Sequence, residues 1–114
     1  MFAGTDSDGS AIYVGRAHHS CDLIPGKFLT GPSFPNLCHV SYDGQEFSKD
    51  TSEVLINTGY AWVPASDGNV PPNACVGGRT SSGEVLYVGR ALHCGFMTPG
   101  KVHPSHGCLY LPYG

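Results

Sequence analysis

The feature that most constrains this chain is a segment that occurs twice. Residues 13–19 (YVGRAHH) return 74 positions later as residues 87–93 (YVGRALH). Over residues 4–27, 12 of the 24 positions are identical at that offset. Self-similarity of this density is typical of an internal repeat, in which each copy adopts the same supersecondary structure. We therefore expect two similar units and treat equivalent positions as pairs.

Length and composition limit the class of protein. A chain of 114 residues has room for one domain with one modest core. Its 16 glycines and 9 prolines are spread along the chain and predict many turns. The net charge of −3 provides no general attraction to nucleic acid or acidic lipid. No apolar run approaches the length of a membrane span, so we expect neither nucleic-acid binding nor membrane insertion.

The N-terminus and the cysteines predict a cytoplasmic protein. Residues 1–6 (MFAGTD) have no basic region and no apolar core, so they do not resemble a signal peptide. Cysteine occurs an odd number of times, and only Cys38 and Cys108 fall near equivalent places in the two copies. A disulfide framework would be more regular, so we expect free thiols. The five cysteines are Cys21, Cys38, Cys75, Cys94 and Cys108.

Short β-branched and aromatic runs between turn residues predict an all-β fold. We expect strands at residues 11–14, 37–42, 53–56, 60–63, 85–88 and 108–111. Turns are expected over residues 1–10, at both Pro-Gly pairs, and at Asp43-Gly44, which is a strong hairpin signal. No segment has apolar residues at helical spacing over three turns. The prediction is a sandwich or barrel-like domain with little or no helix.

The two copies are incomplete in different ways. Nothing like residues 62–65 (WVPA) precedes the first copy, and nothing like residues 52–55 (SEVL) follows the second. We expect one domain over residues 1–114, with a first repeat at 1–61 lacking its N-terminal part. The second repeat, at 62–114, lacks its C-terminal part. Unpaired strand edges and apolar surface then predict a homodimer.

Basic residues are concentrated at repeated positions. Arg16 is equivalent to Arg90, and Lys27 is equivalent to Lys101, which accounts for four of the six basic residues. An Arg beside a strand and a glycine is expected to hold a carboxylate or backbone carbonyls, with ligand contact as the alternative. A Lys after Pro-Gly is expected on an exposed turn, where its mobile donors suit a ligand. A merely solvated lysine is the alternative there.

The sequence gives less support for a metal site or for a cysteine nucleophile. His103, His106 and Cys108 lie close together, and zinc takes such ligands, but the spacing matches no usual zinc pattern. A Cys–His nucleophile is conceivable, but no residue marks one cysteine as activated. We therefore expect no metal, no cofactor and no enzyme. Carboxylates on turns together with lysines at repeated positions suit a sugar-binding module, because a carboxylate and an ammonium can bind adjacent hydroxyls.

Several motifs occur in a fixed order along nearly the whole chain. They are Gly77-Gly78 and residues 86–91 (LYVGRA), 99–102 (PGKV), 104–108 (PSHGC) and 110–114 (YLPYG), with residues 62–66 (WVPAS) before them and 52–55 (SEVL) closing the earlier unit. With these motifs the chain resembles the DM9 repeat family, which includes natterin-like proteins and small tandem-repeat lectins of invertebrates. Those lectins bind mannose and act in innate immune recognition, typically without a signal peptide. The resemblance implies a mannose-binding lectin, with release by an unconventional route as one option for a protein without a signal peptide. The alternative is a structural or protein-interaction module without sugar binding.

The resemblance also implies which residues contact mannose. They are an Asp two residues after the Gly-Gly and the Lys of Pro-Gly-Lys. In the first copy these are Asp6 and Lys27. In the second copy Lys101 is present, but Thr80 holds the position of the Asp, and Glu84 is expected to replace the missing carboxylate in part. We therefore expect unequal sites, with the first site stronger, and binding that needs no metal because no repeated carboxylate cluster exists to hold calcium.

Overall fold

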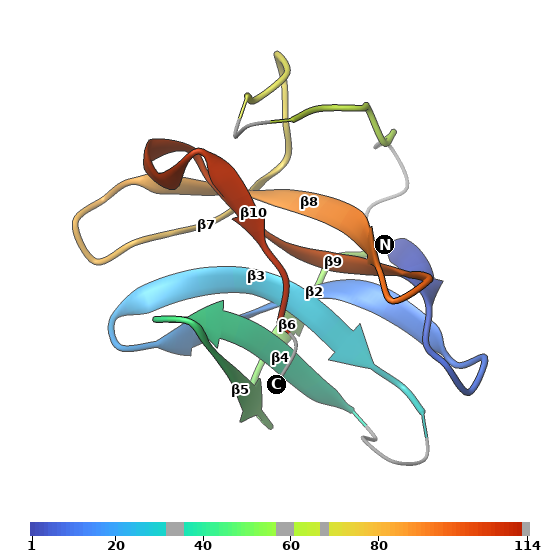
Figure 1. Cartoon of the computed structure of the whole chain (residues 1–114). Helices are drawn as coiled ribbons and strands as arrows, with labels where there is room; N and C mark the ends of the chain where they lie inside the picture. Colours follow the sequence, from blue (N-terminus) through green and yellow to red (C-terminus); the bar gives the residue numbers. More distant parts are fainter. Residues whose placement is uncertain (32–35, 57–60, 67–68, 113–114) are drawn as a thin grey trace.

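The computed structural model describes residues 1–31, 36–56, 61–66 and 69–112. The first copy contains β1 (Phe2–Thr5), β2 (Ala11–His19), β3 (Asp22–Leu29), β4 (Leu37–Tyr42), β5 (Gln45–Lys49) and β6 (Glu53–Val54). The second contains β7 (Val76–Arg79), β8 (Val85–His93), β9 (Phe96–His103), the 3-10 helix η1 (Pro104–His106) and β10 (Cys108–Tyr110). In Figure 1, β2 to β5 form the lower part of the molecule and β7 to β10 the upper part. The all-β prediction is confirmed. Within the described ranges, no helix has the length and apolar character needed to cross a membrane.

Each copy is built on a long antiparallel hairpin. β2 pairs with β3 up to His19–Asp22, and β8 pairs with β9 up to His93–Phe96. The two-residue connections have positive φ at both positions, 49° and 68° in the first hairpin and 52° and 86° in the second. Such connections match the right-handed twist of the paired strands. β2 and β8 are longer than the strands expected at 11–14 and 85–88, and β3 and β9 were not expected as strands.

The predicted turns at Pro25-Gly26 and Pro99-Gly100 are wrong. Both pairs lie inside strands, β3 and β9 respectively. A Cβ atom on Gly26 would collide with the carbonyl oxygen of His39, and one on Gly100 would collide with that of Tyr110. The glycines are needed because β4 and β10 approach the neighbouring backbone closely, which glycine permits inside a strand.

The first strand of each copy packs on the other copy. β7 pairs with β8 and also meets β3 at Leu23–Arg79, where Gly78 lies against the Leu23 carbonyl. In the same way, Gly4 of β1 lies against the backbone of Met97 in β9. The expectation of turns throughout residues 1–10 is therefore wrong for Phe2–Thr5. Its glycine suggested a turn, but the tertiary contact makes this segment a strand.

Other expected elements had mixed outcomes. The hairpin at Asp43-Gly44 is confirmed, with φ of 51° and 74° between the paired residues Tyr42 and Gln45. The strand expected at 53–56 is limited to β6, and 61–63 are not a strand, while residue 60 lies outside the described residues. Lys27 pairs with His39, as Lys101 does with Tyr110. Cys38 and Cys108 therefore lie one residue from exact equivalence, which agrees with the expectation of near-equivalent places. All five cysteines are free thiols.

The hydrophobic core is better closed in the first copy. Its buried cluster contains Ala17, Ile24, Cys38 and Val40, against which Phe47 of β5 packs. β6 then pairs with β2 at Gly15–Val54 and Arg16–Glu53. Over the second copy, the segment that includes residues 61–66 and 69–75 arches above β8 instead (Figure 1).

Candidate functional site

The two repeated arginines join the copies. Arg16 Nη1 donates to the carbonyl of Gly77 at 3.4 Å, and Arg90 Nη1 donates to the carbonyl of Ala3 at 2.7 Å. Ala3 and Gly77 are equivalent positions, so the two contacts are related by the repeat. Arg16 also donates through Nε to Glu53 Oε1 at 2.9 Å. The predicted structural role of the arginines, which hold carbonyls and a carboxylate, is confirmed.

The two repeated lysines are buried rather than exposed. Only 8% of Lys27 and 6% of Lys101 is accessible to solvent. The expectation of exposed turn lysines is therefore wrong, because both residues lie within strands whose side chains face the interior. A buried ammonium is costly unless it is paired with polar or charged groups, so the partners of each lysine define its role.

Lys27 lies beside a carboxylate from its own copy. Its Nζ is 3.5 Å from Glu46 Oε2, and His39 Nδ1 lies 3.5 Å from the same oxygen. Burial alone would raise the pKa of the Glu46 carboxyl, but hydrogen bonding to His39 and the charge of Lys27 hold it below its ordinary value. Glu46 belongs to β5, so the strand that closes the first copy also provides this carboxylate.

Lys101 lies between groups from both copies. Its Nζ is 5.8 Å from the ring centroid of Tyr42 and 5.3 Å from that of Tyr110. Both distances are within the range of cation–π attraction. Burial lowers the pKa of Lys101, while the negative charge of Asp22 opposes that effect. The ammonium, Asp22 and the two tyrosines form the cluster that we call the Lys101 site.

Asp22 is the site residue that sequence reasoning missed. It is 8% exposed, and its Oδ1 accepts a hydrogen bond of 2.7 Å from the backbone N–H of Ser81, directly after Thr80. Asp22 is equivalent by sequence to Phe96, just as Asp6 is equivalent to Thr80. A carboxylate is thus absent at Thr80 but present on the adjacent strand at Asp22. The sequence signal is that Asp22, like Asp6, is an aspartate whose equivalent in the second copy is not acidic. This signal can be interpreted only when β7 is known to lie beside β3.

Glu84 contacts His103 and Ser105 at η1, and its expected part in sugar binding stays a prediction. Its Oε1 accepts hydrogen bonds from the Ser105 hydroxyl at 2.7 Å and lies 3.0 Å from His103 Nε2. Its Oε2 accepts from the Ser105 backbone N–H at 2.9 Å. The Ser105 hydrogen bonds hold the pKa of the Glu84 carboxyl below its ordinary value. These contacts anchor η1, whereas the carboxylate that acts on Lys101 is Asp22. Thr80 itself accepts from the Glu84 backbone N–H at 3.1 Å.

Asp6 lies in the turn between β1 and β2. Its Oδ1 accepts from the Ser7 backbone N–H at 2.8 Å. In the register of the sheet, Asp6 follows the pair Thr5–Ala11, while Lys27 lies opposite Val14. The repeat also predicts that Asp6 neighbours Phe96, as Thr80 neighbours Asp22. Joint contact of Asp6 and Lys27 with one sugar remains a prediction.

The histidines near the C-terminal end pack against aromatic rings. His103 and His106 stack with ring centroids 3.6 Å apart, and His106 Nδ1 lies 2.9 Å from the hydroxyl of Tyr110. Among the residues that the structure describes, no group of three or more His, Cys, Asp or Glu is placed to hold a metal ion. The expectation of metal-free binding remains a prediction.

Two interlocked copies of one hairpin unit define the class of this chain, an all-β tandem-repeat protein. The family model of the DM9 repeat matches residues 6–114, and the chain therefore belongs to the DM9 repeat family. No curated protein matches the chain in sequence.

Proposed function

We propose that the chain is a lectin that binds mannose or mannose-containing glycans and serves in innate immune recognition. The observation that supports this most is the Lys101 site, where an ammonium lies near two tyrosine rings from the two copies and the charge of Asp22 acts on it. The resemblance to the mannose-binding DM9 lectins points to the same sugar. The alternative remains a DM9 module that binds protein and no sugar.

The groups of the Lys101 site suit adjacent sugar hydroxyls. Asp22 would accept from one hydroxyl, and Lys101 would donate to its neighbour. Ser81 orients the Asp22 carboxylate through Oδ1, so the geometry of the acceptor is set before the sugar arrives. Tyr42 and Tyr110 are half-buried and would form the rim, where an aromatic face can cover the C–H surface of the sugar.

A glycan array followed by calorimetry with mannose tests the proposal. We expect Lys101→Met to weaken binding about ten-fold or more, because a hydrogen bond to a charged group contributes about 1.5–3 kcal/mol. Asp50→Asn, at an exposed position, is the control and should bind as the unchanged chain does. An array without any mannose-containing hit, obtained with folded protein, would favour the protein-interaction alternative.

Chelation tests the metal-free mode of binding. We expect mannose binding to persist in EDTA, because lysine already provides the positive charge. Complete loss of binding in EDTA, restored by calcium, would overturn this part of the proposal.

We also propose a homodimer. Among the described strands, β5 pairs only with β4 and β10 only with β9, so each leaves an edge that a second copy can extend. Light scattering at micromolar concentration should then give about twice the chain mass of 12.0 kDa. A single species at the chain mass would contradict the dimer.

A further inference from the structure

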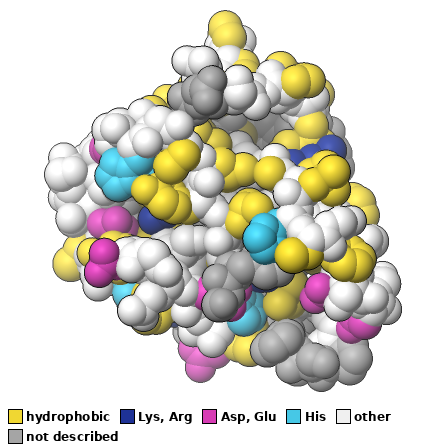
Figure 2. Space-filling view, viewed as in Figure 1, with side chains coloured by type: hydrophobic (Ala, Val, Ile, Leu, Met, Phe, Trp, Pro, Cys, Tyr) yellow, Lys and Arg dark blue, Asp and Glu magenta, His cyan; other side chains and the backbone are white. Residues whose placement is uncertain are grey.

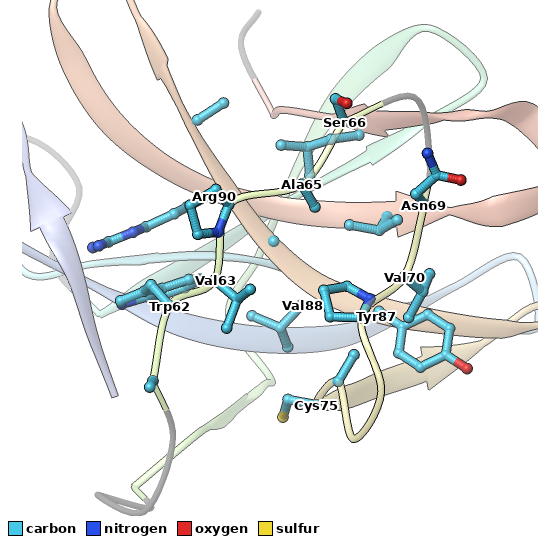
Figure 3. Close-up of a pocket in the computed structure, with 18 of the residues that line it drawn as sticks. Trp62, Val63, Ala65, Ser66, Asn69, Val70, Cys75, Tyr87, Val88 and Arg90 are labelled. Carbon is cyan, nitrogen blue, oxygen red and sulfur yellow. The ribbon is translucent and has the colours of Figure 1, made fainter.

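A large apolar groove lies on β8, away from the Lys101 site. The segment that includes residues 61–66 and 69–75 arches over the strand and encloses a cavity of about 880 Å³. Figure 3 shows Val63 and Val88 on the groove walls, with the Trp62 ring beside the Arg90 side chain at one end. In Figure 2 the hollow beneath the arch is lined mainly by hydrophobic side chains, with Lys or Arg at its edge.

The repeat shows what occupies the equivalent place on the first copy. There β6 pairs with β2 at Gly15–Val54 and Arg16–Glu53, and the Leu55 N–H donates to the Val14 carbonyl at 2.9 Å. The cavity that remains beside β6 is about 190 Å³. The corresponding residues of β8 are Val88, Gly89 and Arg90, and among the described strands none pairs with this part of the outer edge.

The residues just before the groove confirm that the two places correspond. The Val14 N–H donates to the carbonyl of Met1 at 2.9 Å, and the Val88 N–H donates to that of Cys75 at 3.0 Å. Met1 and Cys75 are equivalent positions. The backbone before β1 and before β7 thus meets the two hairpins in the same way, and beyond this point β6 pairs with β2 only in the first copy among the described strands.

We propose that the β8 groove binds a short extended peptide of another polypeptide, with an acidic residue followed by a β-branched and then a larger apolar residue. Strand addition to an exposed edge is a common mode of peptide recognition. The acidic side chain would accept from Arg90 Nε, as Glu53 accepts from Arg16 Nε at 2.9 Å. The peptide backbone would pair with Gly89, and the apolar side chains would enter the cavity.

Arg90 is held in position for this role. Its Nη1 donates to the Ala3 carbonyl at 2.7 Å, and its guanidinium carbon lies 4.1 Å from the centre of the Trp62 ring. These two contacts restrict the orientation of the Arg90 guanidinium. Burial lowers the pKa of Arg90, but its guanidinium stays charged at any physiological pH.

A second copy of the chain is a less favourable source of the peptide. In the described part of the chain, two segments have this pattern. Glu84 to Leu86 leads into β8 itself, where Val85 and Leu86 pair with β7, and Glu53 to Leu55 already pairs with β2. Moving either segment to the β8 groove of another copy would uncover the surface that it leaves. The exchange would gain little, so we assign the groove to a different polypeptide.

Trp62 allows a direct test because it is the only tryptophan of the chain and lines the groove. The probe is a capped peptide with the sequence of residues 51–56 (TSEVLI), which has no aromatic residue. We expect a saturable change in tryptophan emission when it is titrated into the full chain. The Glu→Gln peptide should bind at least about five-fold more weakly, since it lacks the charge that meets Arg90. A peptide of scrambled order should give no saturation.

Two variants sharpen the result. Arg90→Gln should remove the difference between the Glu and Gln peptides. If that variant fails to fold, Ala91→Phe, which fills the groove without changing Arg90, should abolish the emission change. The proposal is overturned by no change at about 1 mM peptide, the weak end of specific binding, or by an equal response to the scrambled peptide. It is also overturned if tryptophan emission changes with protein concentration and the peptide does not reverse that change, because a second copy of the chain then occupies the groove.

Discussion

The two copies have the same hairpin but differ in how well it is covered. Val14 is 2% and Ala17 3% exposed, whereas the identical residues Val88 and Ala91 are only half-buried. The difference comes from β5 and β6, which cover the first hairpin and have no counterpart among the described strands of the second. Burial here depends on a segment that occurs once, not on the repeated residues themselves.

The same difference changes the surroundings of the repeated lysines. Lys27 finds its carboxylate, Glu46, on the strand that closes its own copy. Lys101 has no such strand and lies near Asp22 of the other copy, between two tyrosine rings. Equivalent residues can therefore acquire different chemistry when one copy is completed by its own chain and the other by its neighbour.

The largest expected effect is on folding free energy, and it tests a close backbone contact that both copies share. Gly26→Ala and Gly100→Ala should each cost about 3 kcal/mol of folding free energy, because the added Cβ meets a backbone carbonyl that cannot move aside easily. Urea unfolding of both variants measures the loss. Gly44→Ala, where nothing lies within 4 Å but φ is +74°, should cost only about 1 kcal/mol of conformational strain. If Gly26→Ala leaves the free energy of unfolding unchanged, the backbones of β3 and β4 do not approach each other this closely.

The next largest effect is also on folding free energy, and it tests the difference in burial between the two copies. Val14→Ala should cost about 2 kcal/mol and Val88→Ala about half of that, since each buried CH₂ contributes about 0.8 kcal/mol and only Val14 is fully covered. The residues are identical, so each variant is the control for the other in the same urea experiment. Equal losses would mean that the second copy is covered as well as the first, as it would be in a dimer closed through this face.

A smaller effect decides between the two sugar sites. The sequence predicts that Asp6→Ala or Lys27→Ala removes most binding and Lys101→Ala less. The position of Asp22 leads us to expect that Asp22→Asn weakens mannose binding several-fold, by about 1 kcal/mol. Calorimetry on Asp6→Asn and Asp22→Asn compares the sites directly. If only Asp6→Asn weakens binding, the Lys101 site does not bind the sugar.

The smallest effect concerns the rate of thiol modification. Burial in the closed copy raises the pKa of the Cys38 thiol to about 12, so little thiolate exists at pH 8. Iodoacetamide should modify the exposed Cys21 and Cys94 first, Cys108 more slowly, and Cys38 only after unfolding. Mass spectrometry of the labelled peptides gives the order. Labelling of Cys38 in the folded chain would contradict its burial in the core of the first copy. Unusually fast labelling of any cysteine well below pH 8 would support the Cys–His enzyme hypothesis.

Local sequence was informative where the structure depends on near neighbours. The repeat and its β-branched runs predicted an all-β fold, and Asp43-Gly44 predicted its hairpin, because positive φ is easily adopted by these residue types. The arginines were also predicted correctly, since a planar guanidinium beside a strand end usually holds backbone or carboxylate oxygens. These features needed no knowledge of how the two copies meet.

The contacts between the copies were decided only by the tertiary structure. Glycines that suggested turns became strand residues because a distant backbone lies where a Cβ would be. Lys27 and Lys101 became buried because their strands carry them into the interior. Asp22 came to act on Lys101 from 79 positions away in the sequence, because the first strand of each copy packs on the other copy. A pattern within one copy contains no information on such contacts, since the partner atoms belong to the other copy.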